Sequence, residues 1–90
     1  MNPKRWELSL SGGYALEVDV KKDDCNREPP HCHLTFRGRR IGQIWAESGR
    51  FERVPSDVPS SIINDAMYEV ERNRWEIIEV YKYNRENGAY

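Results

Sequence analysis

The sequence has few cysteines, no excess of positive charge and no long apolar run. Its 90 residues include two cysteines, Cys25 and Cys32, too few for a disulfide framework, so we expect both thiols to be reduced. The 14 basic and 15 acidic residues give a net charge of -1, which argues against a general polyanion binder. No stretch approaches the ~20 apolar residues of a membrane span, and the first residues lack the apolar run of a signal peptide. We therefore expect a cytoplasmic protein that makes no membrane contact.

Length and periodicity predict a single folded domain over residues 1–90. Ninety residues are enough for one domain and too few for two. A charged fraction of 32% and a mean hydropathy of -0.89 describe a polar chain. However, 11% aromatic residues and a clear apolar periodicity argue against disorder.

Alternation of apolar and polar residues predicts an antiparallel meander of four to five strands within about residues 5–54. Residues 6–10 and 14–20 alternate on either side of Ser11-Gly12-Gly13, which favours a hairpin. A third strand is expected directly after Pro29-Pro30, because prolines lack the N–H group that the middle of a sheet requires.

The third strand has two distinct faces, and the fourth breaks the pattern. One face of the third strand carries Cys32, Leu34 and Phe36, and the other carries His31, His33, Thr35 and Arg37. Residues 41–46 alternate less cleanly, so the fourth strand is either covered on both faces or bulged near Gly42. Residues 51–54 are predicted to form a short edge strand.

From Asp57 onward the apolar period lengthens to about 3.6 residues, which predicts two helices within about residues 58–86, packed on one face of the sheet. Asn73 followed by Glu76 has the form of a capping box and places a break near Asn73. A single long helix with a bend is the alternative. Large aromatic side chains bury a large area, so we expect three tryptophans in the core or at its edge: Trp6, Trp45 and Trp75. The predicted fold class is α+β.

The segment Pro29-Pro30-His31-Cys32-His33 carries the strongest chemical signal. Histidines at positions i and i+2 of a strand project from the same face, where two imidazoles can share one metal ion. Zinc or a similar divalent metal would need further ligands. Cys25, Asp19 and Glu17 are the candidates, whereas Cys32 points to the opposite face and would be a poor one.

The same residue types could instead perform acid–base chemistry. His31, His33 and Arg37, with a carboxylate from the second strand, resemble the layout of a metal-independent ribonuclease, in which imidazole moves a proton and guanidinium stabilises the phosphorane. The competing interpretation is structural: a ring that hydrogen-bonds the loop after two prolines defines where the strand begins. Because the chain has no glycine-rich phosphate loop and no nucleophile elbow, we expect a non-enzymatic role before a catalytic one.

Charge is unevenly distributed along the chain. Residues 30–56 hold five arginines and two acidic residues, a net charge of +3, and residues 57–90 hold four basic and seven acidic residues, a net charge of -3. Both regions are explained by solvated surfaces. The sharper interpretation is that a basic sheet edge meets an acidic partner or RNA.

The segment Glu28-Pro29-Pro30-His31-Cys32-His33-Leu34 resembles the Pro-Pro-His-x-His signature of a family of small bacterial proteins that is described only as a domain of unknown function. In that family the motif follows two strands and precedes a glycine-containing turn and two helices, an order similar to that over residues 5–87 here. Cys32 replaces a more frequent phenylalanine, and the loop before the motif looks longer and more charged. The resemblance implies a small protein partner, as in a toxin–antitoxin-like pair, and a motif carried by Pro29, Pro30, His31 and His33.

Three functions follow from these patterns. The first is a small bacterial interaction module that acts with a small protein partner. The second is an RNA-cleaving toxin that uses His31, His33 and Arg37, and the third is a metal-binding module built on His31 and His33. Self-association into a homo-oligomer is compatible with each of them.

Overall fold

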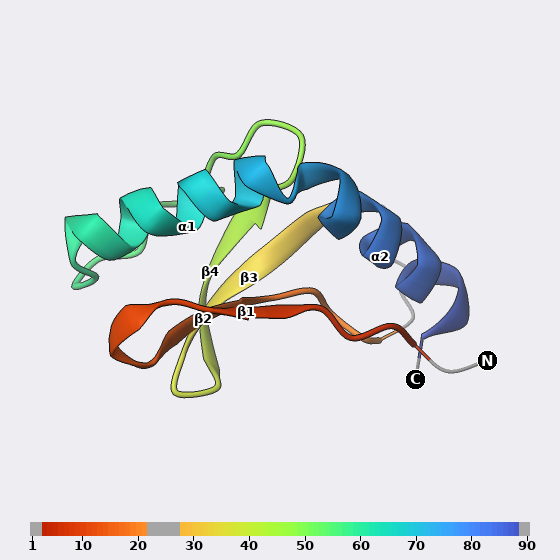
Figure 1. Cartoon of the computed structure of the whole chain (residues 1–90), viewed down its shortest axis with the longest axis horizontal. Coiled ribbons are helices and arrows are strands. Elements are labelled where there is room, and N and C mark those ends of the chain that lie inside the picture. The colour runs from red at the N-terminus through yellow and green to blue at the C-terminus, as the bar shows by residue number, and fades with distance from the viewer. Residues whose placement is uncertain (1–2, 22–27, 89–90) are drawn as a thin grey trace.

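The computed structural model describes residues 3–21 and 28–88 and contains an antiparallel sheet followed by two helices (Figure 1). The strands β1 (Glu7–Ser9), β2 (Tyr14–Glu17), β3 (His31–Phe36) and β4 (Arg39–Trp45) are neighbours in that order. Each strand pairs antiparallel with the next. The predicted α+β meander is therefore confirmed.

Local irregularities of the sheet match the sequence pattern in part. Ser11–Gly13 forms a short 3₁₀ turn between β1 and β2, in which Gly12 and Gly13 have positive φ angles. The predicted bulge lies next to Gly42: Leu34 pairs with Gly42 and Thr35 pairs with Arg40, which leaves Ile41 as the extra residue. The predicted edge strand at 51–54 is reduced to one bridge between Phe51 and Ile44.

Two helices, rather than one bent helix, follow the sheet. They are α1 (Ser60–Arg72) and α2 (Arg74–Asn87), separated at Asn73 as predicted. The predicted capping box does not form, since no side-chain cap bond is present at the start of α2. Instead, the Asn73 side-chain amide donates to the Glu69 carbonyl at 2.8 Å, so this side chain closes the end of α1.

The hydrophobic core lies between the helices and one face of the sheet, and both helices cover that face (Figure 1). From the sheet it takes Leu16, Val18, Cys32, Leu34, Ile44 and Ala46, and from the helices Ile62, Ala66, Val70, Ile77, Ile78 and Tyr81. All of these residues are less than 9% exposed, so the predicted alternation of the strands and the apolar stripe of the helices meet in one cluster.

The three tryptophans do not share one environment. Trp6 is 8% exposed, as predicted, and Trp45 is half-buried. Trp75 is 78% exposed, so its predicted place in or beside the core is wrong. Helical spacing explains this, because Ile77 and Tyr81 define the buried side of α2 and Trp75 falls on the opposite side. Within residues 3–21 and 28–88, no helix is both long and apolar enough to cross a membrane.

Candidate functional site

The two histidines of the Pro-Pro-His-x-His segment lie together at the beginning of β3. The strand starts at His31, directly after Pro30, so both imidazoles leave the same side of an extended backbone. Their ring centroids are 5.2 Å apart and the ring planes stand at 87° to each other. The structure thus brings His31 and His33 together as the spacing predicts.

His31 is held by contacts on several sides. Its Nδ1 lies 2.9 Å from the Pro29 carbonyl oxygen, and its side chain is almost fully buried. Its ring centroid is 5.8 Å from that of Trp45 and 4.8 Å from that of Tyr81 on α2. The Glu28 carboxylate lies 3.8 Å from the remaining ring nitrogen. These contacts fit a residue that fixes the start of β3, and they leave little of the ring accessible to a substrate.

His33 lies beside a small ionic network on the face opposite the helices. Arg40 donates from Nε to a Glu17 carboxylate oxygen at 3.1 Å and from Nη1 to an Asp19 carboxylate oxygen at 3.4 Å. His33 pairs across the strands with Glu17 on one side and with Gln43 on the other. One arginine therefore bridges two carboxylates next to the imidazole.

This environment keeps His33 uncharged near neutral pH. Burial lowers the pKa of His33 most strongly, the positive charge of Arg40 and the electrostatic effect of His31 lower it further, and Asp19 and the Gly42 backbone oppose the shift in part, which leaves a pKa of about 4. Burial by itself raises the pKa of Asp19, but the hydrogen bond from the Lys21 N–H and the Arg40 guanidinium bring that pKa below its usual value.

Arg37 is not part of this group. The strand ends at Phe36, and Arg37 turns away with a φ of 50°. Its guanidinium carbon lies 5.1 Å from the centroid of the Phe36 ring. The arginine beside His33 is Arg40, because the bulge at Ile41 places Arg40 opposite Thr35 on the face that carries His33.

The described residues do not fit a zinc site. Within residues 3–21 and 28–88, no three His, Cys, Asp or Glu side chains are grouped closely enough to hold a metal ion. Two imidazoles alone do not complete the set of four ligands that zinc takes in structural sites. Cys32 faces the core, as predicted, and burial raises the pKa of its thiol to about 12, which disfavours the thiolate that binds metal. Cys25, the other candidate thiol, lies outside the described residues.

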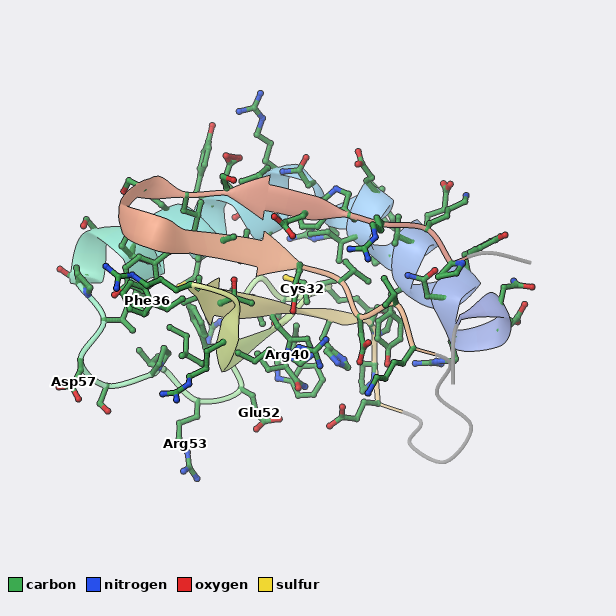
Figure 2. The ribbon with its side chains drawn as sticks, turned by 90° about the horizontal axis from the view of Figure 1, so that it is seen from below. Cys32, Phe36, Arg40, Glu52, Arg53 and Asp57 are labelled. Carbon is green, nitrogen blue, oxygen red and sulfur yellow. The ribbon has the colours of Figure 1, made fainter. Side chains whose placement is uncertain are left out.

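A groove of about 900 Å³ runs beside β4, between that strand and residues 52–58. Its walls are formed by Tyr14, His33, Phe36, Arg39, Arg40, Ile41, Gly42, Gln43, Glu52, Arg53, Val54, Pro55, Ser56, Asp57 and Val58. Figure 2 looks at the molecule from below and shows Phe36, Arg53 and Asp57 around this region, with Arg40 further along the sheet.

The groove combines apolar surface with arginines, and the carboxylates of Glu52 and Asp57 also line it. The rings of Tyr14 and Phe36 lie 4.7 Å apart, and Val54 is 60% exposed. Arg39 and Arg53 are exposed, and neither forms an ion pair within the described part of the chain. Apolar surface with arginines at its edge is a feature of surfaces that bind other molecules.

The sequence carried a signal for this groove, but only a partial one. Three arginines of the basic region 30–56 (Arg39, Arg40 and Arg53) and residues 41–43 of the irregular fourth strand lie on its walls, together with the carboxylates of Glu52 and Asp57. The path of residues 52–58 along β4 could not be predicted, because this segment makes no regular strand or helix.

The chain matches no known protein family, no curated protein and no solved structure. The resemblance at Pro29, Pro30, His31 and His33 therefore stays a prediction.

Proposed function

We propose that this chain is a small protein-interaction module that binds a partner protein through the groove beside β4. The groove is the observation that carries the proposal. It places two aromatic rings, an exposed valine and two arginines that form no ion pair within residues 3–21 and 28–88 around one concave surface, which Glu52 and Asp57 also line. Aromatic residues and arginine are the residue types enriched where proteins bind proteins.

The state of the histidines supports binding rather than catalysis. A general base works best with a pKa near the working pH, whereas the pKa of His33 is about 4. His31 is buried against Tyr81 and lies within hydrogen-bonding distance of the Pro29 carbonyl. Arg37 lies at the turn after β3, away from the imidazole pair. The three residues proposed for RNA cleavage thus lack a shared accessible site.

Within this proposal the module is cytoplasmic and acts with a small protein, as the family resemblance implies for a toxin–antitoxin-like pair. The partner binds at the groove, and His33, near the beginning of β3, lines it.

The test is co-purification of the tagged full chain from its native host, with stoichiometry read from the purified complex. Val54→Asp puts a charge on an exposed groove residue and should remove the partner. Trp75→Ser changes an exposed aromatic residue on α2, outside the groove walls, and should retain the partner. Loss of the partner with Trp75→Ser but not with Val54→Asp would place binding on the helices and refute the groove.

The RNA-cleaving alternative predicts a different outcome. Inducible expression of the chain alone would then arrest growth, and His33→Ala would relieve the arrest while Val54→Asp would not. That combination, with no stoichiometric partner recovered, would replace the proposed function.

A further inference from the structure

We propose that the groove accepts an extended acidic segment of the partner, which adds to the free edge of β4 as a further strand. This inference rests on the proposed function and names the chemistry of the occupant. In strand addition, hydrogen bonds to the backbone of a sheet edge hold the segment, and alternate side chains fill the neighbouring pockets.

β4 is the last strand of the sheet, and its outer edge is only half occupied. The Trp45 N–H donates to the Arg50 carbonyl at 2.9 Å, and the Glu52 N–H donates to the Gln43 carbonyl at 2.8 Å. Apart from the turn bond between the Gly49 N–H and the Trp45 carbonyl, no other backbone hydrogen bond joins β4 to the segment after it in the described part of the chain. Among the described residues nothing pairs with the outer edge of residues 39–42, and this part of the strand lines the groove.

The segment after β4 leaves the groove open beside this free edge. A Cβ placed on Gly42 would lie 3.2 Å from the Phe51 ring and 3.4 Å from the Pro55 ring, so the missing side chain lets both rings pack directly on the strand. Beyond Pro55 the chain continues to α1 without pairing with β4. Val54 and Val58 line the groove together with Ile41. Apolar side chains of an added segment fit this surface.

Charge selects an acidic segment and the β4 edge. The free edge itself, residues 39–42, carries Arg39 and Arg40 and no acidic residue, whereas the 52–58 wall carries Arg53 together with the exposed carboxylates of Glu52 and Asp57. Arg39 and Arg53 form no ion pair among the described residues. Arg40 is already bridged to two carboxylates, so Arg39 supplies the free positive charge at the edge itself, and Arg53 adds a second one on the wall that also carries Glu52 and Asp57. Carboxylates of an added strand would be attracted to them.

The opposite edge of the sheet offers a poorer template. β1 has only three residues, and its exposed Glu7 lies across from Glu17 of β2. An acidic segment at that edge would meet carboxylates of the same sign, and a short strand offers fewer backbone bonds. The two free edges therefore differ in both length and charge, and both differences favour β4.

The experiment measures fluorescence anisotropy of the full chain with short fluorescein-labelled peptides of alternating residues. A glutamate–valine peptide should bind, and its lysine–valine counterpart should bind at least about tenfold more weakly, a difference that charge complementarity readily supplies. N-methylation of the glutamate–valine peptide at alternate residues removes the N–H groups on one side. Methylation of one alternate set of residues should abolish binding and methylation of the other set should not. The reason is that an added strand forms hydrogen bonds to β4 through only one of its two sides.

Variants locate the binding surface. Arg39→Glu combined with Arg53→Glu should weaken binding of the glutamate–valine peptide by about tenfold. Arg72→Glu makes the same kind of charge change at the exposed end of α1 and should change binding less than about twofold. In hydrogen exchange, the peptide should protect amides of residues 39–43 and not those of residues 7–9.

Three results would overturn the inference: equal binding of the lysine–valine peptide, indifference to both methylation registers, or protection confined to β1. If a fluorescein-labelled single-stranded oligouridine binds more tightly than the acidic peptide, the groove arginines bind RNA and the inference is wrong. A molecular mass of a dimer in solution, at the protein concentrations used, would mean that a second copy of the chain occupies the β4 edge. If the peptides fail but Val54→Asp still removes the native partner, the proposed function stands and strand addition is wrong.

Discussion

The side chain of Asn84, near the end of α2, forms hydrogen bonds with both the N–H and the carbonyl group of Lys4. Asn84 Oδ1 accepts from the Lys4 N–H at 2.7 Å, and Asn84 Nδ2 donates to the Lys4 carbonyl at 2.8 Å. The same Nδ2 also donates to the Asp19 carbonyl at 3.0 Å. Asn84 is 1% exposed, so one buried amide joins the second helix to the chain before β1 and to the chain after β2.

Replacement of Asn84 by leucine should destabilise the protein by about 3 kcal/mol, because it leaves one N–H and two carbonyl groups without their buried partner. The measurement is urea denaturation followed by circular dichroism. Asn84→Asp is the informative companion, since it retains an acceptor for the Lys4 N–H but loses both donated bonds. A leucine variant as stable as the native protein would show that the amide contributes only packing.

Acid should destabilise the protein through His33. The pKa of His33 is about 4 in the folded protein and near its ordinary value of 6.5 in the unfolded chain, so between these values the unfolded chain binds the proton first. The contribution is complete above pH 6.5 and is lost as the pH falls towards 4. We expect a loss on the order of 2 kcal/mol over this window.

Denaturant titrations at several pH values measure this dependence, and His33→Gln is the control that cannot titrate. Because the pKa of Asp19 is also lowered, protonation of its carboxyl destabilises the protein too, but at lower pH than protonation of His33. The difference between the native protein and His33→Gln therefore reports the contribution of the imidazole alone. An NMR titration in which His33 takes its proton near pH 6.5 would contradict the expected burial.

The fold could be predicted from the sequence because its local signals agree. Pro29-Pro30 marks where β3 begins, the glycines at 12 and 13 mark the first turn, and Asn73 marks the break between helices. Asn84 could not be predicted, because a polar residue in a C-terminal helix gives no sign of which distant backbone it will meet. Its partners are 65 and 80 residues away in the chain.

The site could be predicted only where it is local. His31 and His33 share one strand, so their spacing alone places them together. The sequence predicted Arg37 beside the imidazoles, but the structure places Arg40 there. This difference depends on one extra residue at Ile41, because a single-residue shift moves a side chain to the other face of a strand. The sequence indicated a bulge near Gly42, but not that it would bring an arginine to the imidazole.

A side chain at position 42 should disturb the segment that bounds the groove. Gly42→Val would crowd the rings of Phe51 and Pro55, and we expect it to cost about 2 kcal/mol. Exchange of the Glu52 amide should accelerate, because displacement of Phe51 loosens the bond from that amide to the Gln43 carbonyl. Native-state hydrogen exchange measures the amide directly.

Gly38→Ala is the matched control for this variant. Gly38 has a φ of +83°, and a Cβ added there would have no atom of a non-adjacent residue within 4 Å, so its substitution strains the backbone without crowding the groove. It should lower stability by about 1 kcal/mol and leave the relative protection of the Glu52 amide unchanged. Equal acceleration in both variants would mean that Glu52 exchanges through global unfolding and that Gly42 has no local role.

The opposite environments of Trp6 and Trp75 give a prediction that bears on where a partner can bind. Trp6→Ala removes a side chain that is 8% exposed and should cost about 3 kcal/mol, whereas Trp75→Ala removes one that is 78% exposed and should change stability by less than about 0.5 kcal/mol. In acrylamide quenching, most of the quenchable emission should disappear with Trp75→Ala and persist with Trp6→Phe. Because the proposed groove lies on the sheet side, saturating partner should leave Trp75 open to acrylamide. Protection of Trp75 by the partner would instead make the helical surface the binding site.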